Sequence, residues 1–268
     1  MILTAENYYS QEADREYLSV SQYKKFAGCL GRPGCEAHAM AQLNGEWQDK
    51  TTTALLVGSY VDAHFEGTLD VFKAQHSELF TKTTGALKAE YKRAEEVINR
   101  IERDEYFMAH MAGQKQVIMT GELFGAKWKI KMDSYFPDVL IVDLKTMKSL
   151  GDSFYVADFG NMDFIRNWGY DIQGAVYQKI VELNTGKKLP FKIAAASKEE
   201  YPDIEIIQVE QSLLDAALEE VKQNVPKILA LKRGQYAPVR CERRDCDYCK
   251  HTKVLTHSIW SDELLVNL

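Results

Sequence analysis

The sequence lacks the long apolar run that a membrane-spanning helix needs. No stretch of about eighteen consecutive apolar residues occurs in the chain. The first residues, MILTAENYYSQEADREY, contain neither the basic segment nor the apolar segment of a secretion signal. We therefore expect a chain that is neither secreted nor membrane-spanning and that works in the cytoplasm.

The sequence also lacks an excess of positive charge. Its 33 Lys and Arg residues are outnumbered by 39 Asp and Glu residues, which gives a formal net charge of −6. Proteins that coat nucleic acid nonspecifically rely on many basic residues, because such binding is driven by counterion release. The composition argues against that role, although an acidic exterior is compatible with a basic cleft. The candidates for a basic cleft are Lys127, Lys129, Lys131, Lys145 and Lys148.

Cysteine is scarce, with five residues in 268. Five cysteines in a chain of cytosolic character do not indicate a disulfide framework. Cys241, Cys246 and Cys249 lie within nine residues of one another, which is typical of half of a metal or cluster site. A remote cysteine would complete it, and Cys35, just before a predicted helix, is a better fourth ligand than the alternative, Cys29. Free thiols also remain compatible with this pattern.

The stretch VLIVDLKT, residues 139–146, carries the strongest signal. Its first four residues are apolar without alternation, which predicts a strand covered on both faces. The strand ends in Asp143 and Lys145, which the two-residue period of a strand places on one face. Charges at the end of a buried strand cost desolvation energy unless they are paired, hydrated or bound to a metal. An ion pair at the strand end is the simpler interpretation of this tripeptide alone.

A second acid lies ten residues upstream, in the alternating stretch KWKIKMDSY. A three-residue connection at 137–139 would place Asp133 directly opposite Asp143 in an antiparallel hairpin, whereas a two-residue connection would place the two acids on opposite faces. A shared site therefore requires the three-residue connection. A tighter hairpin further upstream would pair Glu122 with Lys129 and bring Glu122 to the same face. Three carboxylates and a lysine would then converge at one end of a small sheet.

Such a group of carboxylates points to metal-dependent hydrolysis. Carboxylates held close together repel one another unless a cation lies between them. Mg²⁺ accepts one or two carboxylates together with waters and a phosphate oxygen, and it can activate water and neutralise a leaving oxyanion. Lys145 would hold or help deprotonate the attacking water and stabilise charge in the transition state. The residues therefore predict a phosphodiester hydrolysis site that uses Mg²⁺ or Mn²⁺.

Helices on either side of this region supply further candidates. In ALLVGSYVDAHFEG, residues 54–67, Asp62 and Glu66 share one helix face, while His64 points elsewhere. In RNWGYDIQGAVYQKIVELNTG, residues 166–186, Gln173 and Tyr177 share a face. A solvated or core-edge helix face is the simpler interpretation of each pair. We also expect a long helix over 86–112, an irregular loop over 146–164, two strands over 191–209 and a helix over 212–234.

Together these residues resemble a known motif. Asp133, nine intervening residues and Asp143-Leu144-Lys145 resemble the PD-(D/E)XK nuclease motif, and the chain is similar to the branch that contains RecB-type domains, lambda exonuclease and the RecE nuclease domain. The resemblance implies an α/β fold with a restriction-endonuclease-like mixed sheet flanked by helices. It implies one domain over 1–268, with a helical part at 1–112 and a cysteine-containing segment at 238–268.

The resemblance also implies roles for individual residues. The family commonly has a metal-binding histidine four residues after a helix glycine, where this chain has Asp62 instead. The glutamine and tyrosine match the family's Q-x-x-x-Y motif, in which the glutamine approaches the site. The implied metal ligands are Asp133 and Asp143, assisted by Asp62 and Glu122, and the implied catalytic residues are Asp133, Asp143, Lys145, Gln173 and Tyr177.

In the iron–sulfur subset of RecB-type nucleases, one early and three late cysteines hold a [4Fe–4S] cluster. The resemblance therefore implies such a cluster on Cys35, Cys241, Cys246 and Cys249, although their spacing differs from the commonest version. Zn²⁺ and free thiols remain open.

We conclude from the sequence that the chain is a metal-dependent exonuclease of duplex DNA, in phage or recombination-linked DNA processing. The resemblance also implies a ring-like homo-oligomer and a single-strand annealing protein as a partner. One alternative is an endonuclease. Another is a non-catalytic DNA-binding or assembly protein on the same fold, which would be indicated if Asp133 and Asp143 faced opposite sides of the sheet. A third is a cysteine-metal module whose acids are structural.

Overall fold

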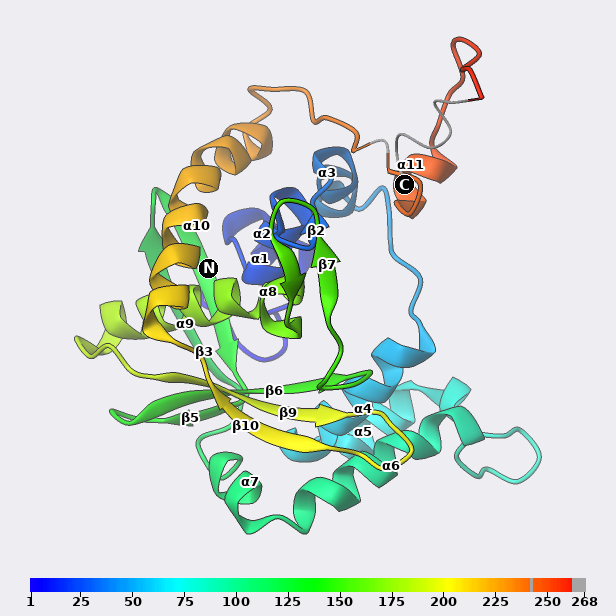
Figure 1. Cartoon of the computed structure of the whole chain (residues 1–268), viewed down its shortest axis with the longest axis vertical. Coiled ribbons are helices and arrows are strands. Elements are labelled where there is room, and N and C mark those ends of the chain that lie inside the picture. Colours follow the sequence, from blue (N-terminus) through cyan, green and yellow to red (C-terminus); the bar gives the residue numbers. More distant parts are fainter. Residues whose placement is uncertain (242, 262–268) are drawn as a thin grey trace.

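A mixed sheet of four strands forms the centre of the computed structural model, which describes residues 1–241 and 243–261 (Figure 1). The strands lie in the order β10-β9-β6-β5, with bounds Ser134–Phe136 for β5, Leu140–Met147 for β6, Phe191–Ser197 for β9 and Ile204–Gln208 for β10. β6 and β9 run parallel, whereas the two outer pairs are antiparallel. The predicted α/β class with a mixed sheet flanked by helices is confirmed.

Both faces of the sheet are covered, as the unbroken apolar start of β6 predicts. Ile141 packs into the core shared with α9 (Tyr170–Thr185) and α10 (Gln211–Lys232). The neighbouring Val142 points the other way, into the core shared with α4 (Thr53–Glu66) and α6 (Ala89–Glu102). Figure 1 shows these two helix layers on opposite sides of the sheet. Alternate residues of β6 therefore face α9 or α4.

Two glycines let the covering helices approach the sheet closely. A Cβ atom added at Gly174 of α9 would lie 2.5 Å from the ring of Phe191 on β9. A Cβ atom added at Gly58 of α4 would lie 3.1 Å from the hydroxyl of Thr146 on β6. Because both helices can lie this close, polar side chains near the two glycines reach the end of β6.

The remaining elements surround this layered core. The hairpin of β3 (Val117–Leu123) and β4 (Ala126–Met132) leads into β5, and a bridge between Leu18 and Trp128 ties the N-terminal segment to β4. The other elements are α1 (Gln11–Glu16), α2 (Val20–Phe26), β1 (Gly28–Cys29), β2 (Arg32–Pro33), α3 (Glu36–Asn44), α5 (Leu69–Gln75), the 3₁₀ helix Ser77–Leu79, α7 (Glu105–His110), β7 (Phe154–Val156), β8 (Gly160–Met162), α8 (Phe164–Trp168) and α11 (Asp247–His251).

Three segments differ from the expected secondary structure. The helix expected over 86–112 is interrupted, because the Asp104 side chain accepts a hydrogen bond of 2.9 Å from the Phe107 amide and so begins α7. The loop expected over 146–164 contains the β7–β8 hairpin. The helix expected over 166–186 is divided at Gly169, whose φ of 64° ends α8.

In the segment expected to carry the late cysteines, 238–268, α11 lies near α3, and the described residues after α11 extend away from α3 (Figure 1). Residues 242 and 262–268 of this segment lie outside the described residues. Among the helices of the described ranges, none has both the length and the apolar character required to cross a membrane.

Candidate active site

The turn between β5 and β6 fixes the positions of the first two acids. Tyr135 pairs with Ile141 and Phe136 with Leu140, so the connection has the predicted three residues, 137–139. Asp133 directly precedes β5, and its Oδ2 accepts a hydrogen bond of 2.9 Å from the Leu144 amide on β6. The predicted register is confirmed, and it brings the Asp133 carboxylate to the strand that carries Asp143.

Asp143 is the most deeply buried acid of the site, with 2% of its surface exposed. Its Oδ1 accepts a hydrogen bond of 2.5 Å from Gln173 Nε2 on α9, and its Oδ2 forms an ion pair with Lys145. Burial raises the pKa of Asp143 to about 6. The Lys145 ammonium offsets part of the rise that burial causes, and repulsion by Asp133 adds to that rise. Burial lowers the pKa of Lys145, but attraction to the two aspartates outweighs burial and leaves that pKa raised.

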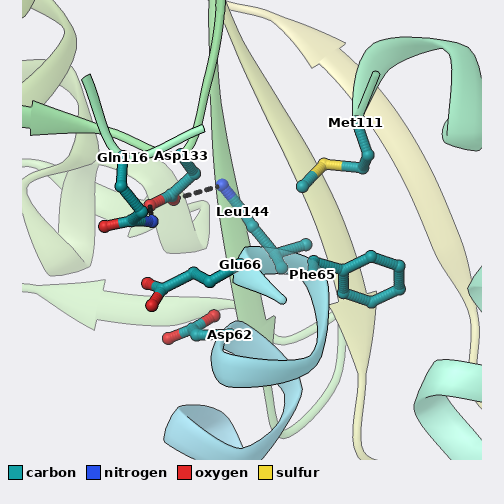
Figure 2. A pocket seen from close by; sticks show the side chains of 7 residues that line it. All are labelled: Asp62, Phe65, Glu66, Met111, Gln116, Asp133 and Leu144. Carbon is teal, nitrogen blue, oxygen red and sulfur yellow. Dashed lines mark hydrogen bonds between the residues drawn. The ribbon is translucent and has the colours of Figure 1, made fainter. Parts of the chain in front are cut away.

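Helix α4 adds two more acids. Figure 2 shows the carboxylates of Asp62 and Glu66 turned toward Asp133. Burial, followed by repulsion from Asp133, raises the pKa of Asp62 well above its usual value. Burial also raises the pKa of Glu66, which the Lys131 ammonium 4.0 Å away partly counters. Gln116 donates a hydrogen bond of 3.2 Å to Asp133 Oδ1 and holds that side of the carboxylate.

The four acids and Lys145 line one open cavity of about 240 Å³. Its acidic residues are Asp62, Glu66, Asp133 and Asp143, and its basic residues are Lys24, Lys129, Lys131 and Lys145. Ser19, Ser21 and Tyr9 line the same cavity. A solvent-open cavity that brings carboxylates and ammonium groups together suits an anionic ligand held next to a cation.

The carboxylates fit a hard divalent ion. Asp143 Oδ2 is buried, and the group that contacts it among the described residues is the Lys145 ammonium. Asp62 and Asp133 repel Asp143 within the same cavity. Oxygen ligands that raise one another's pKa in this way are relieved by Mg²⁺ or Mn²⁺. Asp133 and Asp143 would hold such an ion, with Asp62 beside them.

The other predicted site residues have different positions. Tyr177 lines the cavity, but its hydroxyl donates a hydrogen bond of 3.0 Å to the Lys131 carbonyl, so it fixes β4 against α9. Glu122 is exposed beside the β3–β4 turn, and in the described structure it does not line the cavity. His64 lies 2.8 Å from Glu102, away from the acids, as the helical spacing predicts.

The expected register of the β3–β4 hairpin is wrong. The turn consists of Phe124 and Gly125, both with positive φ, which is the pattern of a two-residue hairpin turn. Glu122 therefore pairs with Lys127 instead of Lys129. The pairing moves Glu122 toward the turn end of the strand and away from Asp133.

The lysines expected to form a basic cleft divide into two groups. Lys129, Lys131 and Lys145 line the cavity. The Lys129 side chain is only 1% exposed, however, and forms an ion pair of 2.7 Å with Asp14. Lys127 pairs with Glu16, so Lys127 and Lys129 both fasten α1 to β4. Lys148 is exposed and is not among the cavity residues in the described structure.

Sequence reasoning left two charged residues of the cavity unassigned. Glu66 lies one helical turn after Asp62, and that spacing was the signal that could have identified it. Lys24 donates a hydrogen bond of 2.9 Å to the Trp168 carbonyl, a contact between distant parts of the chain that no local pattern predicts. Burial, together with repulsion from Lys145, lowers the pKa of Lys24 to about 8.

The structure also gathers four of the five cysteines. The sulfur atoms of Cys35, Cys241, Cys246 and Cys249 all lie within 4.8 Å of one another. Cys29 points away from them and donates a hydrogen bond of 3.3 Å to the Asn167 carbonyl. The structure therefore brings Cys35 to the three late cysteines and leaves Cys29 outside the group.

Replacing Gln173 by alanine tests how the site is held. The amide fixes Asp143 from α9, so its loss is expected to reduce cleavage about 10- to 100-fold, as for outer-shell partners of metal ligands. The matched control is Gln178→Ala on the same helix, because Gln178 bonds the Leu189 carbonyl and Gln211. Cleavage rates of both variants, measured over a range of Mg²⁺ concentrations, would show whether only Gln173→Ala is impaired. Equal rates would show that Gln173 does not support the site.

The sheet order and the acids near the end of β6 are those of a PD-(D/E)XK-type fold with a cluster of carboxylates. Residues 19–252 match the family described as "PDDEXK-like domain of unknown function (DUF3799)", and the chain belongs to that family. It is also similar to the crystal structure of a protein named "Putative exonuclease" from Eubacterium rectale, with 60% sequence identity, a TM-score of 0.95 and coverage of 100% of both chains. No curated protein matches the chain.

Proposed function

We propose that the chain is a Mg²⁺-dependent exodeoxyribonuclease that hydrolyses phosphodiester bonds of duplex DNA. The observation that carries the proposal is the meeting of Asp133, Asp143 and Lys145 with Asp62 in one solvent-open cavity. The family and the 60% identical structure named "Putative exonuclease" support a nuclease. Placement beside RecB-type domains, RecE and lambda exonuclease stays a prediction of the motif resemblance.

In this proposal the acids hold the metal ion, and Lys145 stabilises the negative charge that develops on the phosphate. A divalent ion at the carboxylates supplies charge neutralisation at the phosphate and acidifies water. Because the pKa of Lys145 is raised, its amine is an ammonium at neutral pH and donates hydrogen bonds. We infer that Lys145 positions the attacking water and stabilises the negative charge that develops on the phosphate, while a separate base accepts the proton.

The non-catalytic alternatives fit the site less well. Acids that faced opposite sides of the sheet would have indicated a binding or assembly protein, whereas the Asp133 carboxylate accepts a hydrogen bond from the strand that carries Asp143. A purely structural ion pair would leave no reason for Asp62 and Glu66 to be turned toward the same cavity (Figure 2). The homo-oligomer, the annealing partner and the phage or recombination context stay predictions of the resemblance.

Exonuclease and endonuclease activity are separated by the form of the substrate. We expect Mg²⁺ to support loss of end-labelled linear duplex DNA from its ends while covalently closed circles of the same sequence stay intact. Cutting of the circles at a comparable rate would contradict the exonuclease proposal and favour an endonuclease. Nicked circles, which offer one internal end, provide an intermediate substrate that reports whether a duplex terminus is required.

Metal binding should depend on pH through Asp143. Because the pKa of this acid is raised to about 6, protons compete with the metal below that pH, whereas an ordinary aspartate would stay ionised. The apparent Mg²⁺ affinity is expected to fall about tenfold for each pH unit below about 6. Mn²⁺ binding measured by electron paramagnetic resonance between pH 5 and 8 checks this expectation. A Mn²⁺ affinity that did not change over that pH range would contradict it.

Tyr9 is placed to contact the nucleic acid. Its side chain is 72% exposed, although it lines the cavity of the acids, and the Lys131 ammonium lies 4.8 Å from its ring centre. Stacking of a base on an aromatic ring contributes about 1–3 kcal/mol. We expect Tyr9→Ala to raise KM for DNA roughly 5- to 150-fold with a smaller change in kcat, and Tyr9→Phe to retain the wild-type KM. An unchanged KM in Tyr9→Ala would place the bound strand elsewhere.

A further inference from the structure

The four-cysteine group is too compact for the cluster that the sequence resemblance implies. Cys35 Sγ lies 3.6 Å from Cys249 Sγ, and Cys241 Sγ lies 3.8 Å from the same atom. All four sulfurs fall within 4.8 Å of one another. Each iron of a cubane cluster binds its own thiolate, so the thiolates stand roughly 6 Å apart. The observed spacing leaves no room for four irons and four sulfides.

A single tetrahedral ion matches the same distances. Zinc–sulfur bonds of about 2.3 Å place tetrahedral ligands about 3.8 Å apart. The two contacts at Cys249 have this length, and both are far longer than a disulfide bond of about 2 Å. All five cysteines of the chain are free thiols. Four sulfurs in mutual contact, three of them buried, form a ready-made S₄ ligand set.

We propose that Cys35, Cys241, Cys246 and Cys249 bind one zinc ion, and that this ion fastens the C-terminal segment to α3. The site does not depend on the nuclease proposal, because none of the four cysteines lines the carboxylate cavity in the described structure. Four thiolates with no open ligand position are typical of structural zinc sites.

Groups around the cysteines support a bound ion of this kind. His38 Nδ1 lies 3.9 Å from Cys246 Sγ, while Nε2 of the same ring is 2.8 Å from Asp49 Oδ1. Residues that hydrogen-bond around the ligands commonly fix the orientation of groups at protein metal sites, and Asp49 fixes the His38 ring next to Cys246 in this way. Arg240 donates a hydrogen bond of 2.8 Å to the Cys249 carbonyl, which brings positive charge close to a thiolate-rich centre.

The C-terminal segment is also held by contacts outside the four cysteines. Tyr248 stacks on His38, Trp47 packs against Tyr248 and His251, and Arg243 donates a hydrogen bond to the Pro33 carbonyl. Two hydrogen bonds join the segment to the start of α3, from the Ala37 amide to the Val239 carbonyl and from the Val239 amide to Glu36. The hydrophobic cluster here, however, has four buried members, of which three are the ligands Cys35, Cys246 and Cys249 and the fourth is Ala37. Because the buried centre of the contact consists mainly of these thiols, and α11 with five residues is too short to be stable alone, we infer that the ion stabilises the attachment.

Attachment at Cys35 also affects the neighbourhood of the carboxylate cavity. The Cys35 amide donates a hydrogen bond of 2.9 Å to the Lys25 carbonyl at the end of α2. The preceding residue, Lys24, lines the cavity, as do Ser19 and Ser21 at the start of the same helix. The proposed zinc site is thus joined by this hydrogen bond to α2, whose first half lines part of the cavity.

The test is the metal content of the full chain purified without air and without added metal, measured by inductively coupled plasma mass spectrometry. We expect about one zinc and no iron per chain, together with the absence of the visible absorption band that iron–sulfur clusters give. Cys246→Ser is expected to lose the zinc. Cys29→Ser, which alters the cysteine outside the group, is expected to keep it. Asp143→Asn should also keep it, which separates this result from any failure of nuclease activity.

Alkylation by iodoacetamide, followed by mass spectrometry, provides a second measurement that does not require Cys246→Ser to fold. The wild-type chain should protect its four ligand thiols until a zinc chelator is added, and then lose protection at all four together. Four irons per chain with acid-labile sulfide, or a single iron, would overturn the proposal. Thiols that react equally with and without chelator in a metal-free chain would overturn it as well.

Discussion

Cleavage of linear duplex DNA is expected to fall at least about 10³-fold when Asp143 is replaced by alanine, because several kcal/mol of transition-state stabilisation by the metal is lost. Asp143 is the acid that contacts Lys145 and Gln173 as well as the proposed ion. Its removal therefore breaks the contacts from β6 and α9 at once. The measurement is the release of acid-soluble nucleotide over a range of Mg²⁺ concentrations.

The fold itself should survive Asp143→Ala. Burial raises the pKa of this acid, so the ionised carboxylate itself is unfavourable in the folded chain without metal. Its removal leaves the Lys145 ammonium without its closest partner, but Asp133 still attracts that ammonium. Asp215→Ala is the matched control, because Asp215 is exposed on α10 and pairs with Lys188. We expect that control to cleave at the wild-type rate. A folded Asp143→Ala chain that retained cleavage would show that the reaction takes place elsewhere.

Replacing Lys145 by methionine is expected to lower kcat about 10²- to 10⁴-fold, the range associated with a positioned group that assists proton transfer or charge stabilisation. Methionine keeps much of the length of the side chain and removes the ammonium. Lys148→Met, three residues further along the chain, changes an exposed lysine and should leave kcat unchanged.

The pH profile distinguishes a catalytic role of Lys145 from a structural one. The ammonium lowers the pKa of Asp143, so its loss should raise that pKa above about 6. The metal requires the ionised carboxylate, and the acidic limb of the activity profile is therefore expected to move to higher pH in Lys145→Met. A uniform loss of activity with no movement of this limb would indicate that the lysine acts apart from Asp143.

Local patterns in the sequence predict the central strands well. The apolar start of β6 requires cover on both faces, and the core on each side supplies it through Ile141 and Val142. The polar turn at 136–138 correctly indicates the hairpin, and its odd length predicts the register that brings Asp133 to β6. These predictions succeed because the periodicity and the turn act within about a dozen residues.

The sequence predicts the position of Glu122 poorly, because a hairpin register depends on the conformation of two turn residues. Phe124 and Gly125 both adopt positive φ, which moves the pairing by two positions along β4. Apolar alternation is the same in either register, so the pattern could not distinguish them.

Contacts between distant parts of the chain account for the other residues that the sequence left unassigned. Lys24 reaches the cavity because α2 lies beside Trp168, more than a hundred residues away, and its own surroundings in the sequence carry no sign of this contact. Cys35 could be proposed as the fourth cysteine from its position before a helix. The choice of Cys35 over Cys29, however, depends on how α3 packs against the C-terminal segment, which the sequence does not show.

The central claim is that the carboxylates around Asp143 use a divalent ion to hydrolyse DNA. The most direct measurement compares nucleotide release from linear duplex DNA by the wild-type chain in Mg²⁺ and in EDTA, with folding verified in both by circular dichroism. We predict hydrolysis in Mg²⁺, none in EDTA, and recovery when excess Mg²⁺ is restored. A folded chain that hydrolyses no DNA in Mg²⁺ or Mn²⁺ would contradict the claim, and equal hydrolysis in EDTA would contradict the role of the metal.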